Sequence, residues 1–343
     1  MASKADKPTA IDLFSGAGGL SEGLRRAGFN LVAAIENDEH AANSYALNHP
    51  ATHLVRADIR KVAAQTLLRK LGLQPGELTL LAGCPPCQGF SRMRTKNGAS
   101  SAADDRNSLV LDFVRFARAF RPQYVMLENV PALERDAVFA DVVRKLNGLG
   151  YRSKHRVLDA ADFAVPQRRK RLVALAGRGR APQMPAPARV RRSVRDAIAG
   201  LPKPGALGDP LHDDLSTHAP HVMQIISHVP RDGGSRSSVP GELLPDCHQR
   251  HDGHHDVYGR MAWDLVAPTI TTGCHNPSRG RFLHPDENRA ISLREAALLQ
   301  TFPQRYKFCR TRGKEHVARQ IGNALPPEMI RRIGKSLLKE LRG

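Results

Sequence analysis

Two cysteines stand three positions apart in "GCPPCQGF" (83–90), directly after an apolar run that is typical of a β-strand. The two-residue gap between Cys84 and Cys87 is common to redox pairs and to metal-ligand pairs. A zinc site would need a second pair at a useful spacing, and the Cys–His cluster in 247–254 belongs to a histidine-rich stretch. A thioredoxin-like pair would open a helix directly, whereas this one continues into "QGFSRMR". The pattern therefore favours one nucleophilic thiolate. The alternative is an unreactive cysteine that only packs against its neighbours.

A nucleophile of this kind needs a proton partner. Glu128 ends the apolar run "QYVMLEN" (123–129), and the carboxyl ends of parallel strands meet at the edge of a sheet where ligands bind. The cationic cluster "QRRKR" (167–171) precedes a further apolar run. On local grounds alone, a satisfied loop carboxylate and a solvated charge run explain these residues equally well.

A glycine-rich turn, "SGAGGL" (15–20), follows the first apolar run of the chain. Glycines let a ligand approach the backbone, and the helix that follows offers free N–H groups. Glu36 ends the next apolar run, 20 residues after Gly16, where a carboxylate binds ribose hydroxyls in nucleotide sites. Ser21 replaces the third glycine of the dinucleotide fingerprint, which favours a nucleoside cofactor without a pyrophosphate. Asp58 is a candidate to bind the adenine edge. The plainer interpretation of the glycine-rich segment is a tight turn, and that of Asp58 is a loop or helix-capping aspartate.

These residues need a sheet to position them. Apolar runs alternate with helical patterns, which predicts a doubly wound, mostly parallel α/β sheet. The expected strands lie at 9–14, 31–36, 53–59, 78–83, 123–129 and, as the sixth, 171–178. The expected helices include 21–28, 38–50 and 108–120.

The amino-acid composition of the chain changes after Gly177, where "GRGRAPQMPAPARVRR" is rich in glycine, proline and arginine. Periodicity is poor from there to about 272. We expect a catalytic domain at 1–185, a smaller irregular domain at 186–305, and a C-terminal segment, 306–343, that packs back on the first.

Charge points to a polyanionic partner. Lys and Arg total 52 against 33 Asp and Glu, a formal net charge of +19. The excess is concentrated between Arg152 and Arg195, and such an excess usually indicates nucleic acid. A solvated basic face without a partner stays open as the alternative.

Membrane insertion and secretion are not expected. No segment approaches the ~18 uninterrupted apolar residues of a membrane span, and "MASKADKPTA" contains no apolar signal core. Five cysteines do not make a disulfide framework, so we expect a protein of the reducing cytoplasm.

The order of the blocks along the chain resembles that of the cytosine-5 DNA methyltransferases of bacterial type. The matching blocks are "DLFSGAGGL", "ENDE", "GCPPCQGFS", "ENV", "QRRKR" and "QIGNALPP". The resemblance covers nearly the whole chain apart from about 190–260. It implies a Rossmann-like methyltransferase sheet and a DNA (cytosine-5-)-methyltransferase that uses S-adenosylmethionine as methyl donor and no metal.

The resemblance also implies roles for single residues. Cys87 would be the nucleophile that adds to carbon 6 of cytosine, and Glu128 would hold and protonate ring nitrogen 3. Arg169 would contact oxygen 2 of the base, and Arg171 would orient Cys87 or its loop. Gln167 also falls on the family's pattern, whereas Cys84 falls where that pattern is loose and receives no role.

The cofactor site follows from the same resemblance. Residues expected to line or support it are Phe14, Ser15, Gly16, Ala17, Gly18, Gly19, Leu20, Glu36, Asn37, Asp58, Ile59, Pro86, Leu109, Asn323 and Ala324. Because carbon 5 of a stacked cytosine is inaccessible, the base must flip out. The loop 91–107 suits a lid over the flipped base, although an ordinary loop has the same composition.

The segment 190–270 matches no shared block and stands where the family has its target-recognition region. We expect it to read base edges in double-stranded DNA. We further expect a monomer, associated with the bacterial nucleoid, whose functional partner is a cognate restriction endonuclease in a restriction-modification system.

Three other functions compete with this one. A tRNA cytosine-5 methyltransferase of the same fold would show "PPCQPFTR" and a Cys-Phe-Thr signature, whereas this chain has "PPCQGFSR" and no such signature. A catalytically silent DNA-binding relative is disfavoured by intact Cys87, Glu128 and Arg169. A nicotinamide dehydrogenase is disfavoured by the missing third glycine.

Overall fold

The computed structural model describes residues 7–86, 108–246 and 256–342. The chain divides into two compact units. Unit 1 comprises Met1–Asp159, Lys170–Pro187 and Pro327–Gly343, and unit 2 comprises Ala160–Arg169 and Ala188–Pro326. Residues 160–169, expected within the catalytic domain at 1–185, are grouped with unit 2, and the expected third segment is divided. Its residues 306–326 lie in unit 2, and only the final helix belongs to unit 1.

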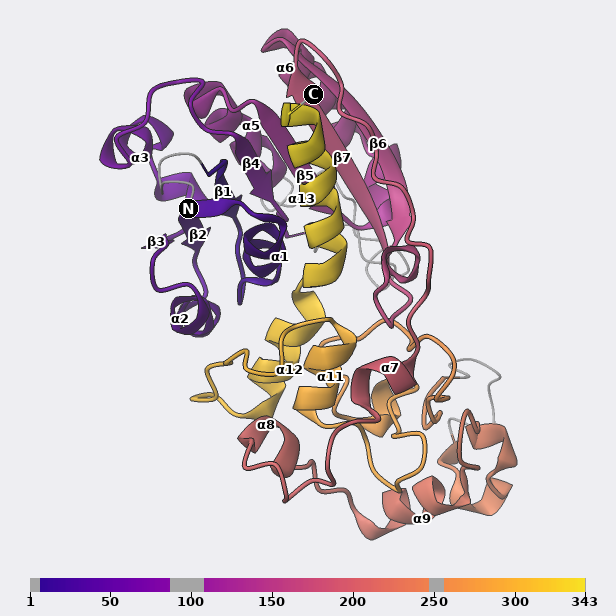
Figure 1. Ribbon diagram of the computed structural model, residues 1–343. Helices are drawn as coiled ribbons and strands as arrows, with labels where there is room; N and C mark the ends of the chain where they lie inside the picture. The colour runs from indigo at the N-terminus through magenta and orange to yellow at the C-terminus, as the bar shows by residue number, and fades with distance from the viewer. Residues whose placement is uncertain (1–6, 87–107, 247–255, 343) are drawn as a thin grey trace. The chain divides into compact units, whose positions relative to one another are not determined.

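A seven-stranded sheet forms the centre of unit 1, in the order β3-β2-β1-β4-β5-β7-β6 (Figure 1). The strands are β1 (Thr9–Leu13), β2 (Asn30–Glu36), β3 (His53–Arg56), β4 (Leu80–Gly83), β5 (Tyr124–Asn129), β6 (Tyr151–Asp159) and β7 (Lys170–Arg178). The first five strands pair in parallel, and β7 runs antiparallel to both β5 and β6. The mostly parallel α/β sheet expected from the sequence is confirmed.

One strand corrects the sequence analysis. Segment 171–178, expected as the sixth strand, is the seventh, β7, and β6 precedes it. β6 lies at the edge of the sheet, and its side chains at Arg152, Lys154 and Arg156 are exposed. Of its nine residues, only Tyr151 at one end and Leu158 near the other are buried. A strand buried so sparsely carries no apolar run, which is the signal that reveals a central strand.

Helices cover both faces of the sheet. They are α1 (Gly19–Ala27), α2 (Glu39–Asn48), α3 (Ala64–Lys70), α5 (Ser108–Phe120), α6 (Ala137–Gly148) and α13 (Pro327–Arg342), with 3₁₀ turns η2 (Ile59–Lys61) and η5 (Pro131–Arg135). Successive side chains of β1 point to opposite faces of the sheet. Ile11 and Leu13 join the core that contains α3 and α5, whereas Asp12 points to Ser21 of α1 and Tyr45 of α2. The expected helices at 21–28, 38–50 and 108–120 are therefore present.

Local sequence explains where these helices begin and end. α1 lies between Gly18 and Gly28, both of which have positive φ, a conformation that favours glycine. α2 begins after Asp38, whose carboxylate accepts a hydrogen bond from the Ala41 N–H at 2.8 Å. α1 and α13 pack so closely that a Cβ on Gly23 would lie 2.5 Å from that of Ile330 (Figure 1).

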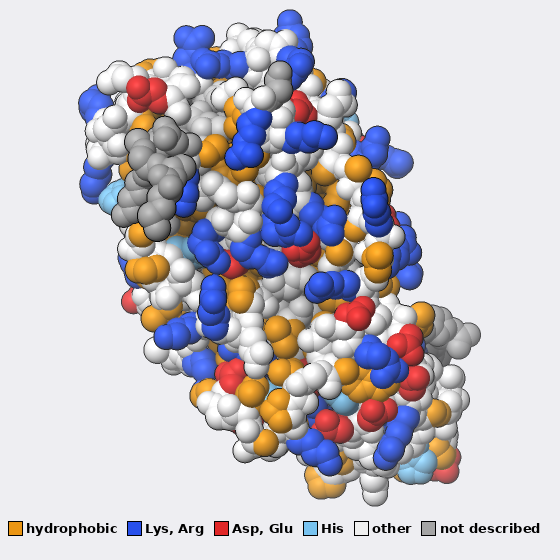
Figure 2. Space-filling model, viewed as in Figure 1, with side chains coloured by type: hydrophobic (Ala, Val, Ile, Leu, Met, Phe, Trp, Pro, Cys, Tyr) orange, Lys and Arg blue, Asp and Glu red, His pale blue; other side chains and the backbone are white. Residues whose placement is uncertain are grey.

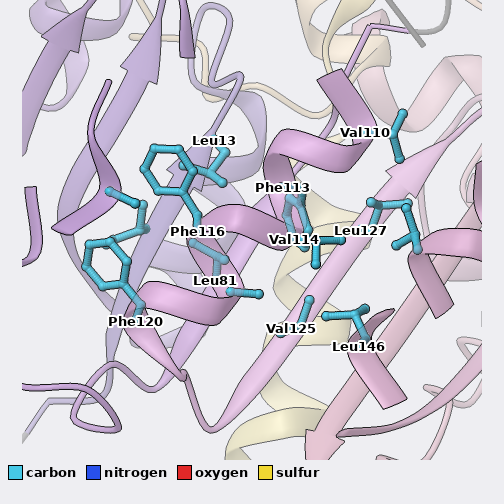
Figure 3. Packing of buried hydrophobic residues seen from close by; sticks show 14 of the residues in the cluster. Leu13, Leu81, Val110, Phe113, Val114, Phe116, Phe120, Val125, Leu127 and Leu146 are labelled. Carbon is cyan, nitrogen blue, oxygen red and sulfur yellow. The ribbon is translucent and has the colours of Figure 1, made fainter. Parts of the chain in front are cut away.

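Apolar side chains of α5 hold the central strands in place (Figure 3). Phe113, Phe116 and Phe120 recur at helical spacing and are fully buried. They pack in one cluster with Leu81 of β4 and Leu127 of β5. Burying each aromatic ring contributes about 1.5–3 kcal/mol. This packing fixes the carboxyl ends of β4 and β5, where the candidate catalytic residues follow.

Unit 2 consists of short helices and turns. Its elements are η6 (Ala160–Phe163), α7 (Val194–Ile198), α8 (Pro210–Asp213), α9 (Pro220–His228), η7 (Arg236–Ser238), η8 (Gly241–Leu243), η9 (Pro277–Arg279), α11 (Leu293–Leu299) and α12 (Lys314–Asn323). Arg260 is fully buried and braces this irregular unit. Its guanidinium donates to the carbonyls of Pro230, His284 and Val229, among others. In a regular helix or sheet, backbone N–H groups would donate to such buried carbonyl oxygens. Here the Arg260 side chain donates to them instead.

Candidate active site at the carboxyl edge of the sheet

The glycine-rich turn after β1 forms one end of the candidate site. Phe14, Gly16 and Gly18 all have positive φ, which bends the chain sharply between β1 and α1. The Gly18 N–H donates to the Ser15 carbonyl at 2.9 Å and closes the turn. A Cβ on Gly16 would meet nothing within 4 Å, so open space lies beside this residue. A ligand can therefore approach the backbone here, as the sequence analysis expects.

Glu36, at the end of β2, holds this turn from the neighbouring strand. One carboxylate oxygen accepts a hydrogen bond from the Gly16 N–H at 2.7 Å, and the other accepts from the Asp38 N–H at 2.7 Å. The side chain is almost entirely buried, and this desolvation raises the pKa of Glu36 despite those hydrogen bonds. The backbone N–H of Asn37 also donates to this carboxylate. A carboxylate has about four acceptor positions, so at least one remains for a hydroxyl group.

The other expected cofactor residues of unit 1 lie at the same edge of the sheet. Asp58 follows β3 and caps η2, and its ion pair with Arg60 (2.6 Å) lowers the pKa of Asp58 to about 2. Ile59 and Leu109 are buried members of one apolar cluster. The remaining expected residues divide by exposure. Ser15, Ala17, Gly18, Gly19 and Leu20 are buried, Phe14 and Gly16 are half-buried, and Asn37 and Pro86 are exposed.

A buried carboxyl beneath the turn was missed by the sequence analysis. Asp12 is fully buried within β1, and its carboxylate accepts a hydrogen bond from the Ser21 hydroxyl at 2.7 Å. The Ser21 hydroxyl also lies 2.9 Å from that of Tyr45. Burial raises the pKa of Asp12 to about 7. Ser21, at the third glycine position, is therefore the hydrogen-bond partner of Asp12. The sign of this buried carboxyl in the sequence was a single aspartate within the apolar run "TAIDLF".

Glu128 forms the other end of the site, at the carboxyl end of β5. Its side chain is buried, and one carboxylate oxygen lies 3.0 Å from Nε of Arg171 on β7. β5 and β7 are neighbours in the sheet, so the ion pair joins adjacent strands. The sequence analysis connects Arg171 to Cys87 or its loop, whereas the described contact of Arg171 is with Glu128. Cys87 itself lies outside the described residues.

The segment that leads from β4 to Cys87 is held by β5. The side-chain amide of Asn129 donates to the Pro85 carbonyl at 3.0 Å. The register of the parallel pair sets Gly83 opposite Leu127, so Cys84 follows beside Glu128. The described chain thus brings the end of β4 and the catalytic candidate of β5 together at one edge of the sheet.

The remaining candidates belong to unit 2. Gln167 is fully buried, donates to Gln300 at 2.9 Å and accepts from the Ile270 N–H at 2.9 Å. The buried guanidinium of Arg169 donates to the carbonyls of Ile270 at 3.2 Å and Gly322 at 2.9 Å. Both side chains therefore connect the segment around Ile270 to helices of unit 2. Asn323 and Ala324 stand at the end of α12.

Metal-ligand clusters and membrane spans were also sought. Within 7–86, 108–246 and 256–342, no three His, Cys, Asp or Glu side chains are grouped as metal ligands. The Cys–His cluster at 247–254 lies outside these ranges. None of the described helices is long and apolar enough to cross a membrane.

Comparisons with known proteins extend over nearly the full chain. Residues 9–339 match the family model of C-5 cytosine-specific DNA methylases. The chain is 38% identical to the Type II methylase M.HgiDII of Herpetosiphon aurantiacus, a match that covers 97% of this chain and 96% of that protein. It is 33% identical to the Type II methyltransferase M1.HphI of Haemophilus parahaemolyticus, over 96% of this chain and 87% of that one.

Solved structures share the fold. A crystal structure attributed to a prophage-encoded DNA modification methyltransferase (E. coli) superposes with a TM-score of 0.72 at 25% identity, over 98% of this chain and 100% of that one. The methyltransferase EhMeth of Entamoeba histolytica reaches a TM-score of 0.70 at 15% identity, over 98% and 100% of the two chains. The second likeness supports the fold alone.

Proposed function

The chain belongs to the C-5 cytosine-specific DNA methylase family, and we propose that Cys87 and Glu128 perform its reaction at the carboxyl edge of the unit 1 sheet. It is an S-adenosylmethionine-dependent DNA (cytosine-5) methyltransferase, and its substrate is double-stranded DNA. The observation that carries the assignment is the position of Glu128. It is buried, paired with Arg171 at 3.0 Å, and beside the end of the strand from which Cys87 follows.

The proposed chemistry uses a thiolate because carbon 5 of cytosine is a poor nucleophile. The Cys87 sulfur forms a bond to carbon 6, and Glu128 gives a proton to nitrogen 3, so that no negative charge builds up on the ring. Carbon 5 then takes the methyl group, which S-adenosylmethionine supplies from its sulfonium. A base removes the proton from carbon 5, the bond from carbon 6 to sulfur breaks so that Cys87 leaves as a thiolate, and nitrogen 3 returns its proton to the Glu128 carboxylate.

The proposed cofactor cradle is the turn from Phe14 to Leu20 together with Glu36. The open space beside Gly16 and the acceptor position left on Glu36 fit the sugar of a nucleoside. We propose that Asp58 accepts from the adenine edge. Other proposed members of the cradle are Asn37, Ile59, Pro86, Leu109, Asn323 and Ala324.

Three residues are proposed to support the flipped base. Arg169 contacts oxygen 2 of cytosine, Arg171 holds the Glu128 carboxylate, and Gln167 fixes the segment that carries them. The support for Gln167 is that its carbonyl and amide are both engaged in buried hydrogen bonds. Base flipping is required because the target carbon is inaccessible in stacked DNA.

The biological setting is proposed from the names of the relatives, two of which are Type II modification enzymes. We propose that this chain protects a short DNA sequence, read by 190–270, against a cognate restriction endonuclease in the bacterial cytoplasm. It would act as a monomer and without a metal ion. Lys and Arg side chains are spread widely over the visible face of the molecule (Figure 2), which suits a phosphate backbone.

Bisulfite sequencing tests the function directly. A host that expresses the chain should gain methylated cytosines in one short DNA context, and a host that expresses Cys87→Ser should gain none. Transfer RNA from the same cells is sequenced in parallel. Methylation confined to transfer RNA would replace the DNA assignment with the tRNA one, and methylation by the Cys87→Ser variant would remove Cys87 from the mechanism.

A further inference from the structure

Cys84 is the residue of the opening motif to which the proposed chemistry gives no role. It follows β4, and its backbone N–H donates to the Leu13 carbonyl of β1 at 3.3 Å. Gly83 and Leu127 are opposite each other in the parallel pair of β4 and β5. The next pair in that register is Cys84 and Glu128, whose side chains leave the sheet on the same face.

On that face the register places the Cys84 thiol beside the Glu128 carboxylate, where it can donate a hydrogen bond. Desolvation raises the pKa of Cys84 well above its ordinary value, and the negative charges of Glu128 and Asp12 and this hydrogen bond raise it further. The nearby Arg171 guanidinium acts in the opposite direction and is outweighed. Cys84 therefore stays a neutral thiol near pH 7, unlike a nucleophilic or redox-active cysteine.

The order of the strands places Glu128 between Cys84 on one side and Arg171 on the other. β5 lies between β4 and β7 in the sheet. The Glu128 carboxylate thus has one donor from each neighbouring strand: the Cys84 thiol from β4 and the Arg171 guanidinium from β7, at 3.0 Å. Two donors on opposite sides restrict the rotation of a side chain more than either does alone.

We propose that Cys84 is a positioning residue that, with Arg171, clamps the Glu128 carboxylate in the orientation needed to meet ring nitrogen 3 of the flipped cytosine. This inference rests on the proposed role of Glu128. The two cysteines of "GCPPCQGF" then have separate tasks. Cys87 attacks the base, and Cys84 holds the group that protonates it.

Kinetics of two variants test the clamp. Cys84→Ala removes the donor and should lower kcat about fivefold, the usual effect of one hydrogen bond. Cys84→Ser restores an O–H donor and should stay within about twofold of the parent. Equal losses in both variants, or full activity in Cys84→Ala, would overturn the proposal. Binding of S-adenosylmethionine to each variant confirms that it is folded.

The pH dependence of kcat separates positioning from general structural damage. A donor to a carboxylate favours its ionised form, so the Glu128 carboxyl should keep its proton to higher pH in Cys84→Ala. The alkaline limb of the kcat profile should therefore move to higher pH in Cys84→Ala and return in Cys84→Ser. A uniform loss at every pH would mean that Cys84 supports packing only.

Thiol labelling gives a readout independent of DNA methylation. Cys84 and Cys309 are both half-buried, so a difference in their alkylation reflects the thiol rather than exposure. At pH 8, mass spectrometry after brief iodoacetamide treatment should find Cys84 far less alkylated than Cys309, because the pKa of Cys84 is raised. Glu128→Gln removes the neighbouring charge and should speed alkylation of Cys84 relative to Cys309. If Cys84 reacts as fast as Cys309 in the parent, the clamp is absent. If labelling follows expectation but no DNA is methylated, the clamp stands and the proposed function fails.

Discussion

Glu128 illustrates how a single side chain acquires its task from its surroundings. It is buried at the end of a strand, beside the ion-pair partner Arg171 and beside the segment that leads to Cys87. A carboxyl in such a position is kept from water and can be aimed at one atom of a substrate. Its neighbours, rather than its residue type, distinguish it from the exposed carboxylates of the chain.

Substitution of Glu128 measures that task. Glu128→Gln keeps the shape and one acceptor but cannot donate the acidic proton, so kcat should fall by about 10²–10⁴-fold. DNA binding, measured by fluorescence anisotropy, should stay close to that of the parent. Glu134, an exposed carboxyl of η5, provides the control, and Glu134→Gln should leave kcat unchanged. A loss below about threefold in Glu128→Gln would remove the residue from proton transfer.

Asp12 gives a prediction on stability. Its pKa is raised from 3.8 to about 7 by burial, and Ser21, Tyr45 and Glu36 face it. Between pH 4 and pH 7 the unfolded chain has lost the proton that the folded protein keeps, so the free energy of unfolding falls as pH rises. The raised pKa corresponds to ~4 kcal/mol across this window, and the loss levels off above pH 7.

The variant Asp12→Asn isolates this effect, because its amide oxygen can still accept from Ser21 and it does not ionise. Urea unfolding of parent and variant, compared at several pH values, should show the parent losing stability relative to Asp12→Asn from pH 4 to pH 7. A difference that does not change with pH would mean that Asp12 is ionised in the folded protein over the whole range.

At the scale of the elements, α1 and α13 pack closely at Gly23. A Cβ on Gly23 would lie 2.5 Å from Cβ of Ile330 and 2.6 Å from the Pro327 carbonyl oxygen. Gly23→Ala should therefore force the helices apart and cost about 1–3 kcal/mol, despite the better helix propensity of alanine. Urea denaturation measures the change.

The matched control is Gly148→Ala at the end of α6, where a Cβ would meet nothing within 4 Å. This variant should be neutral or more stable by up to about 1 kcal/mol, because alanine favours the helix. If both substitutions change stability alike, the contact between α1 and α13 does not decide the outcome.

The elements that the sequence predicted correctly are those with strong apolar signals. β1, β2, β4 and β5 are buried runs, and α5 carries aromatic residues at helical spacing. β6 escaped notice because its exposed charged residues hide the few that are buried. The pairing of Asp12 with Ser21 and of Glu128 with Arg171 depends on register between strands and helices distant in sequence, which local patterns do not encode.

At the scale of the whole molecule, we propose that the choice of DNA sequence is separate from the chemistry. The catalytic candidates address one flipped cytosine, and phosphate contacts carry no sequence information directly. Base edges must be read by other residues, and the large region free of family blocks is 190–270. The described part of this region is made of short helices and turns, such as α9 and η8. Arg, Gln, Ser and His side chains there can reach base edges in a groove.

An exchange of this region tests the separation. Replacing 190–270 by the corresponding segment of a relative with another specificity should transfer that relative's methylation context, with methylation still at carbon 5. Sequencing of methylated cytosines from parent and graft is the readout, and binding of S-adenosylmethionine shows that the graft is folded. A graft that folds and retains the parent's context would place specificity outside 190–270.

Unit 1 is assembled from chain segments that unit 2 interrupts, and its last helix, α13, packs on its first, α1. During synthesis at the ribosome, the apolar face of α1 emerges early, but the helix that covers it is translated about 300 residues later. The contact between α1 and α13 can therefore form only after α13 has left the exit tunnel. Closure of the contact around Gly23 is thus a late event in the biogenesis of this enzyme.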